Sequence, residues 1–151
     1  MIVKIKKLDP NAVIPYKAHL SDAGFDLVAT SKHFDEQGNV VYGTGLAFEI
    51  PEGYVGLLFP RSSNAKKDLI LTNSVGVIDS GYRGEVLFKF KPALVFFEGK
   101  PTRVYSEHHQ YEICDKVGQM IIIPYPEIEW QETDSLSETD RGVGGYGSSG
   151  K

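Results

Sequence analysis

Apolar and polar residues alternate along much of the chain with a period of two, which is typical of half-buried β-strands. The alternation covers residues 3–7, 46–50, 85–90 and 111–113, which read VKIKK, LAFEI, EVLFKF and YEI. Two continuous apolar runs, YVGLLF at 54–59 and MIII at 120–123, predict strands buried on both faces. The one helical candidate is SSNAKKDL at 62–69, one or two turns long.

Glycine and proline interrupt these segments about every ten residues, so the pattern predicts many short strands in a sandwich, jelly roll or barrel. The 151 residues favour one domain, which we expect to span 1–130 without an internal boundary. Residues 131–140, QETDSLSETD, are acidic and polar and predict a linker. Residues 141–151 form a glycine-rich tail that composition alone predicts to be mobile.

Charge and cysteine content exclude several classes of protein. The net charge is −4, so nonspecific nucleic-acid binding is disfavoured. A single cysteine, Cys114, gives neither an internal disulfide nor a cysteine metal cluster. The N-terminus is too charged for a signal peptide, and no apolar run is long enough for a membrane span. We expect a soluble, cytoplasmic protein.

Two early segments carry candidate oxyanion and metal chemistry. In DAGFDLVA (22–29), Asp26 could help hold a divalent cation, or simply cap its own turn. In PRSSNAKK (60–67), Arg61 and the hydroxyls after it could cradle a phosphate at a helix start. The alternative is an ordinary helix cap beside a surface arginine.

Residues 73–86, NSVGVIDSGYRGEV, predict a β-hairpin that turns at Ser80–Gly81. Asp79 at its mouth, partly desolvated, could activate a water, and Tyr82 offers a flat face for a sugar or base. A plain turn with a core tyrosine is the alternative. Further on, Gln119 heads an apolar strand, and its amide needs a partner, either a ligand or a neighbouring backbone.

The tail RGVGGYGSSG at 141–150 cannot build a core, but its glycines let it fold over a ligand. Arg141 can cap a phosphate, Tyr146 can stack on a base, and the two serines can bond oxyanion oxygens. A solvated terminus without function and a glycine-rich RNA-binding tail are the alternatives. The single arginine disfavours the RNA-binding tail.

These five segments, in this order over residues 22–150, resemble the five motifs of the homotrimeric dUTPase family. The resemblance implies an all-β, jelly-roll-like subunit in a threefold ring. Each site would lie between subunits, with the phosphate-binding pieces, the hairpin and the C-terminal lid coming from three different chains. The implied reaction is hydrolysis of dUTP to dUMP and pyrophosphate, with magnesium on the triphosphate.

The resemblance also implies residue roles. Asp79 would activate the attacking water, Tyr82 would lie beneath the deoxyribose, and Asp26 would hold magnesium through water. Uracil would be read by Asn73 and by the backbone that follows, including Gly76 and Ile78. The remaining substrate contacts would come from Arg61, Ser62, Ser63, Gln119, Arg141, Tyr146, Gly147, Ser148 and Ser149.

The chain departs from the family pattern in two places. Cys114 stands where the family usually has glycine, so a turn with positive φ would have to differ here. Residues 91–112 also appear as an extended hairpin insertion, with two strands around residues 98–100. The adjacent His108 and His109 within it are disfavoured as metal ligands, because neighbouring strand residues point to opposite faces.

Two other functions compete with hydrolysis of dUTP. A dCTP deaminase, or a bifunctional enzyme, would need a glutamate about ten residues past Asp79, where this chain has Lys89 between two phenylalanines. A nucleotide-sensing binding module with a regulatory protein partner would be expected to show a damaged site, and none is visible. Binding of a regulatory protein, through the insertion at 91–112, stays open as an additional role.

Overall fold

The computed structural model describes residues 1–92, 94–97, 100–103 and 110–145. Within them lie twelve strands and one short 3₁₀-helix. In chain order these are β1 (Lys4–Lys7), β2 (Phe25–Val28), β3 (Ser31–Phe34), β4 (Val40–Gly43), β5 (Leu46–Glu49), β6 (Tyr54–Phe59), η1 (Ser62–Lys66), β7 (Leu69–Leu71), β8 (Gly76–Ile78), β9 (Leu87–Pro92), β10 (Leu94–Phe97), β11 (Lys100–Arg103) and β12 (Lys116–Pro124). The predicted all-β, jelly-roll-like fold is therefore confirmed.

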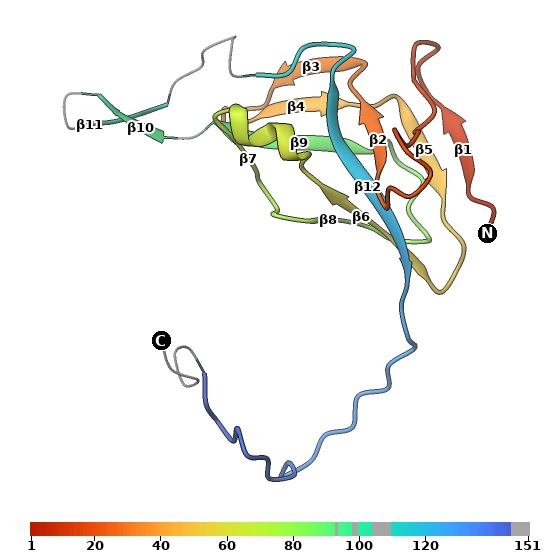
Figure 1. Ribbon diagram of the computed structural model, residues 1–151, viewed down its shortest axis with the longest axis vertical. Helices are drawn as coiled ribbons and strands as arrows, with labels where there is room; N and C mark the ends of the chain where they lie inside the picture. The colour runs from red at the N-terminus through yellow and green to blue at the C-terminus, as the bar shows by residue number, and fades with distance from the viewer. Residues whose placement is uncertain (93, 98–99, 104–109, 146–151) are drawn as a thin grey trace.

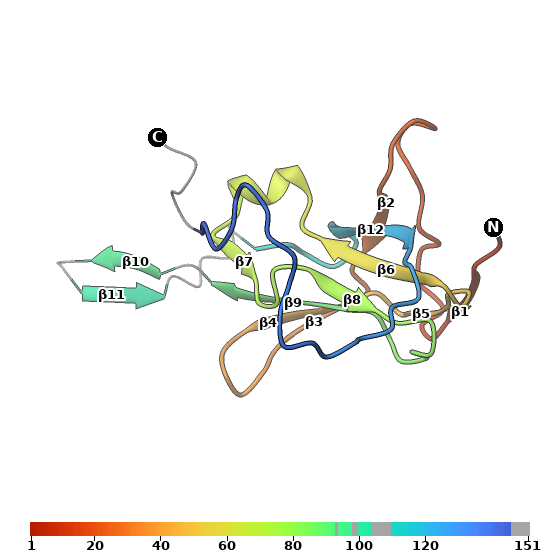
Figure 2. The same ribbon diagram turned by 90° about the horizontal axis from the view of Figure 1, so that it is seen from below.

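Two four-stranded sheets make the body of the domain (Figure 1, Figure 2). One has the order β2-β12-β6-β8 and the other β3-β4-β9-β7, with antiparallel pairing throughout. A two-stranded sheet, β1-β5, lies at one end. The core between the sheets is apolar, and Tyr42, Phe88 and Phe90 are fully buried in it.

The alternating pattern identifies most of the strands. The runs at 3–7, 46–50 and 85–90 become β1, β5 and the start of β9. The runs at 54–59 and 120–123 become β6 and part of β12, but in this chain they are not buried on both faces. Leu58 and Met120 are buried, whereas Ile123 is 40% exposed, because only one face of the sheet packs on the core.

Two strand predictions are wrong. Residues 111–113 form no strand, because Tyr111 directs its backbone N–H and C=O to the Tyr42 hydroxyl. Residues 73–86 do contain a turn, closed where Tyr82 N donates to Asp79 O at 3.1 Å. However, the flanking strands do not pair, since β8 pairs with β6 while β9 joins the other sheet.

The helical candidate forms η1, a 3₁₀-helix rather than an α-helix. Within the predicted insertion, β10 and β11 pair as an antiparallel hairpin that projects from the body beyond the end of β9 (Figure 1). His108 and His109 lie outside the described residues.

After β12 the chain leaves the sheets as an extended arm (Figure 1). Residues 124–143 are all exposed, including several large apolar side chains, Tyr125, Ile128, Trp130, Leu136 and Val143. Trp130 is 89% exposed and Val143 is fully exposed. Within the part of the chain that the structure describes, no helix is long and apolar enough to cross a bilayer.

Gly118 is a close-packing position in β12, and this contact gives the first testable prediction. A Cβ there would lie 2.1 Å from a ring carbon of Phe88. Gly118→Ala should therefore lower the free energy of unfolding by about 1–3 kcal/mol through overpacking. Chemical denaturation would measure the change.

Adding Phe88→Leu should recover part of the loss, because the smaller side chain makes room for the methyl group. Gly145→Ala is the matched control, since a Cβ there meets nothing within 4 Å. Equal stability of Gly118→Ala and wild type would contradict the contact.

Candidate functional site

Three of the singled-out segments meet at one place because β2, β12 and β6 are neighbours in one sheet. Gln119 in β12 is paired with Asp26 on one side and with Phe59 on the other. The chain leaves β6 directly after Phe59, so Arg61 follows within two residues. Segments that are far apart in sequence thus place a carboxylate, an amide and a guanidinium side by side.

Asp26 is a buried carboxylate, 9% exposed, and each of its oxygens binds a cation. Arg61 Nε donates to Oδ1 at 2.8 Å, and Lys116 Nζ lies 2.8 Å from Oδ2. Removing either cation would leave part of a buried negative charge uncompensated. Asp26 is therefore the centre of a small ionic cluster and not a simple turn cap.

Sequence reasoning missed Lys116. Residues three apart on a regular strand face opposite sides, so Lys116 and Gln119 were not expected together. A register shift between Lys116 and Gly118 puts both on the Asp26 side of the sheet. Hydrogen bonding to Asp26, and then to Tyr16, raises the pKa of the Lys116 ammonium group, which also lies 4.5 Å from the Tyr16 ring centre.

The half-buried side-chain amide of Gln119 bonds to backbone. Its Nε2 donates to Pro60 O at 3.1 Å, and its Oε1 lies where a Cβ of residue 24 would otherwise be, 2.3 Å away. Glycine at position 24 is what leaves room for this side chain. Gln119 thus fixes the backbone immediately before Arg61.

Asp26, Arg61 and Gln119 line one cavity of about 340 Å³, which we call the Asp26 pocket. It is polar and open to solvent, and the exposed Ser62 hydroxyl borders it. Its lining is Ala18, Asp22, Ala23, Gly24, Asp26, Arg61, Ser62, Gln119 and Ile121. The Arg61 guanidinium and the Ser62 hydroxyl beside it are hydrogen-bond donors suited to a phosphate-bearing ligand.

Asp79 does not reach the Asp26 pocket. It follows β8, in which Ile78 is paired with Gly56, five positions before Arg61. Asp79 is one residue beyond Ile78, opposite residue 55 of β6. The four positions from there to Phe59, the partner of Gln119, span about 13 Å at 3.3–3.4 Å per strand residue, and Arg61 lies beyond Phe59. Asp79 is also exposed, so the expected partial desolvation is absent in a single chain.

The turn after Asp79 borders a different hollow. That cavity is about 560 Å³ and includes Ser80, Gly81 and Arg83 in its lining. Tyr82 is 43% exposed and held in place, because its hydroxyl donates to Glu85 O at 3.0 Å. Asn73 is exposed at the opposite end of β8, whose Gly76 and Ile78 continue the segment.

Arg141 lies on the exposed arm, in a turn of its own. Its Nε donates to Gly144 O at 3.0 Å, and Gly142 N donates to Thr139 O at 3.0 Å. The other tail candidates, Tyr146, Gly147, Ser148 and Ser149, lie outside the described residues. Within one chain, therefore, Arg141 is not part of the Asp26 pocket.

The expectation that a turn with positive φ could not form at Cys114 is wrong. Its φ is +74°, and its N–H donates to Ala29 O at 2.9 Å. Glu112 N and Asp115 Oδ2 close the same turn at 2.8 Å. The cysteine adopts the left-handed conformation that glycine takes without strain.

This geometry gives a second prediction. Cys114→Gly should raise the free energy of unfolding by about 1 kcal/mol, since relief of strain outweighs the added freedom of the unfolded chain. Cys114→Ala keeps the Cβ and should give no comparable gain. If both variants melt at the wild-type temperature, position 114 is not strained.

Comparison with known proteins decides the family. A family model described as dUTPase matches residues 10–150. The chain belongs to the dUTPase family. The match spans nearly the whole chain, which confirms the resemblance drawn from the five segments.

Individual family members match over most or all of their length. A deoxyuridine 5'-triphosphate nucleotidohydrolase of Rhodococcus erythropolis is 39% identical, covering 98% of this chain and 85% of that protein. The Nautilia profundicola protein of the same name is 38% identical, with 100% of both chains covered. Among solved structures, a Staphylococcus bacteriophage 80alpha dUTPase with dUpNHpp superposes with a TM-score of 0.82 at 27% identity, covering 99% of both chains.

A second solved structure is similar to this chain and contains a metal ion. It is a dUTPase from phage phi11 of S. aureus, described for the coordination of a structural Mg(II) ion. It superposes with a TM-score of 0.72 at 29% identity, covering 90% of this chain and 99% of that one.

Proposed function

We propose that this protein hydrolyses dUTP to dUMP and pyrophosphate at sites shared between three copies of the chain. The observation that carries the shared site is the position of Asp79, about 13 Å of strand away from the Phe59 end of the sheet, where the Asp26 pocket lies. A base and a phosphate-binding arginine so far apart in one chain cannot act on one phosphorus. The Asp26 pocket of one copy and the Asp79 turn of another can.

In the proposed mechanism the Asp26 pocket holds the triphosphate. Arg61, already oriented by Asp26, presents its remaining N–H groups to phosphate oxygens, and Ser62 and Ser63 add hydroxyl donors. Gln119 keeps the Arg61 backbone in place and is also a candidate phosphate contact. Asp79 of a neighbouring copy accepts a proton from the water that attacks the α-phosphorus.

The nucleoside is assigned to the Asp79 side of the site. Asn73 and the backbone near Gly76 and Ile78 would read uracil, and Tyr82 would lie beneath the deoxyribose. Arg141, with Tyr146, Gly147, Ser148 and Ser149, would close the site from a third copy. The exposed apolar side chains of the arm are consistent with contact between copies.

Magnesium would enter this site bound to the triphosphate, without direct ligation by a cluster of protein side chains. Both Asp26 oxygens already bind cations, and the described residues contain no group of three or more potential metal-ligating His, Cys, Asp or Glu side chains. Asp26 and Asp22 in the pocket lining would therefore hold the ion through its waters. When bound, magnesium would offset phosphate charge.

Deamination of dCTP is not supported by position 89. Lys89 pairs with Asp35 at 2.9 Å, and the neighbouring Phe88 and Phe90 are fully buried. A carboxylate that could move protons at a pyrimidine is therefore missing at that place in the chain.

The test is a substrate panel. The purified protein with magnesium would be incubated with dUTP, dCTP, dTTP and UTP, and pyrophosphate and ammonia would be measured. We expect pyrophosphate from dUTP alone and no ammonia. Ammonia from dCTP would indicate a deaminase, and nucleotide binding without any product would favour a sensing module.

Tyr82→Ala gives a further prediction within this panel. Removing the ring should raise the rate on UTP relative to dUTP, because the steric block against a 2′-hydroxyl is lost. Tyr82→Phe keeps the ring and should preserve the wild-type preference. An unchanged rate ratio in the alanine variant would exclude this role for Tyr82.

A further inference from the structure

The segment that carries Arg61 and Ser62 lacks hydrophobic anchorage. It runs into η1, which has no buried residue and no side-chain cap at Arg61. A 3₁₀-helix has poorer hydrogen-bond geometry than an α-helix and holds its position weakly by itself. Polar contacts from elsewhere must therefore fix this segment.

One such contact is the ion pair of Arg61 with Asp26 at 2.8 Å. A second is at Asn64, whose backbone N–H also donates to Arg61 O at 2.9 Å. Its Oδ1 accepts a hydrogen bond from the Tyr111 hydroxyl at 3.1 Å, and its Nδ2 donates to Leu69 O at 2.9 Å. Asn64 is thus tied to Tyr111, a residue that is distant in sequence.

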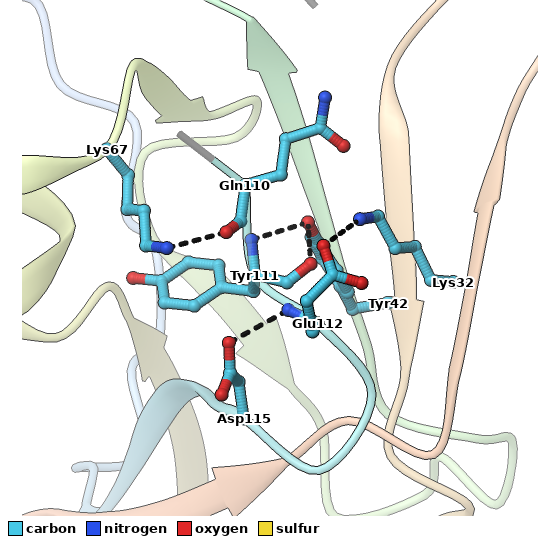
Figure 3. Close-up of polar contacts among 7 residues, drawn as sticks. All are labelled: Lys32, Tyr42, Lys67, Gln110, Tyr111, Glu112 and Asp115. Carbon is cyan, nitrogen blue, oxygen red and sulfur yellow. Dashed lines mark hydrogen bonds and ion pairs between the residues drawn. The ribbon is translucent and has the colours of Figure 1, made fainter. Parts of the chain in front are cut away.

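Tyr111 is itself rigidly held, as Figure 3 shows. Tyr42, fully buried, accepts from Tyr111 N and donates to Tyr111 O, both at 3.0 Å. Lys67 Nζ donates to Gln110 O at 2.5 Å and lies 5.1 Å from the Tyr111 ring centre. Burial raises the pKa of Tyr111, so the hydroxyl keeps the proton that it donates.

We propose that Tyr111 is a positioning residue for the phosphates of the substrate. Its backbone is bonded to Tyr42 in the core, and its hydroxyl is bonded to Asn64. Tyr111 thereby fixes the Asn64 end of the segment Arg61–Asn64, while the Asp26 ion pair fixes the Arg61 end. Tyr111 touches no substrate itself. The inference rests on the proposed binding of dUTP at the Asp26 pocket.

Tyr111→Phe tests this role, because it removes the hydroxyl and keeps the ring that packs edge-on against Tyr42. Loss of one hydrogen bond should weaken binding of dUpNHpp, and raise KM for dUTP, by about two- to tenfold. Binding of deoxyuridine, which carries no phosphate, should not change. General destabilisation would lower the active fraction without altering the ratio of the two affinities.

Tyr54→Phe is the control, since it removes a hydroxyl at the start of β6, far from η1 along the strand. Asn64→Ala, alone and combined with Tyr111→Phe, closes a double-mutant cycle. We expect the combined loss to be smaller than the sum of the two, because both substitutions break the Tyr111–Asn64 bond, while Asn64→Ala alone also removes the bond to Leu69 O. Fully additive losses, or wild-type affinity for dUpNHpp in Tyr111→Phe, would overturn the inference.

The same experiment separates this inference from the proposed function. Wild-type turnover of dUTP combined with an unaffected Tyr111→Phe variant would overturn the positioning role alone. A wild-type protein that neither binds dUpNHpp nor hydrolyses dUTP would overturn both.

Discussion

Asp79→Asn should leave a folded protein that binds dUTP but turns it over about 10²–10⁴ times more slowly than wild type. The amide has nearly the shape of the carboxylate but cannot accept the proton of the attacking water. Asp79 is exposed and outside the buried core, so its replacement removes no packing. Measurements of kcat, of dUpNHpp affinity and of the melting temperature would separate these effects.

Asp134→Asn, on the exposed arm, is the matched control and should retain wild-type kcat. An Asp79→Asn variant that keeps most of its turnover would show that another group is the base. Loss of dUpNHpp affinity in the same proportion as kcat would assign Asp79 to binding instead.

Mixed trimers should recover activity from two inactive parents. Arg61→Ala is expected to lower kcat about 10²–10³-fold, as loss of a charge-stabilising donor does. If Asp79→Asn and Arg61→Ala chains are unfolded together and refolded in equal amounts, about a quarter of the sites should combine an intact arginine with an intact aspartate. Activity should then approach a quarter of the wild-type value.

A second mixture discriminates the models further. Wild-type chains mixed equally with a double variant should give about a quarter of full activity for shared sites, but about half for sites within one chain. Light scattering would verify assemblies of about 50 kDa, three chains of 16.7 kDa. Because Arg61 pairs with buried Asp26, a melting curve must first show that Arg61→Ala is folded.

The sequence predicted individual elements of the fold better than their pairing. Alternating residues revealed β1, β5 and β9, and the reason is clearest in β9, where every second residue is buried in the core. The turn after Asp79 was recognised from its glycine and serine, but local pattern could not show that β8 and β9 join different sheets. Strand partners depend on contacts between distant segments.

The site follows the same division. Asp26, Arg61 and Gln119 were selected for their chemistry, and the sheet order explains why they meet. Lys116 was missed because a register shift breaks the alternation that sequence reasoning assumes. Tyr111 was assigned to a strand, since nothing local indicates that its backbone bonds a tyrosine hydroxyl from β4.

The distance between Asp79 and Arg61 along the sheet has a consequence for the kinetics of the protein. If reacting groups from different chains must meet, a newly made chain is inert until it finds its neighbours. At concentrations below the association midpoint, the initial rate should then rise with the third power of total protein, and become linear only once assembly is complete. Dilution below this concentration would abolish turnover by dissociating the chains, while each chain stays folded.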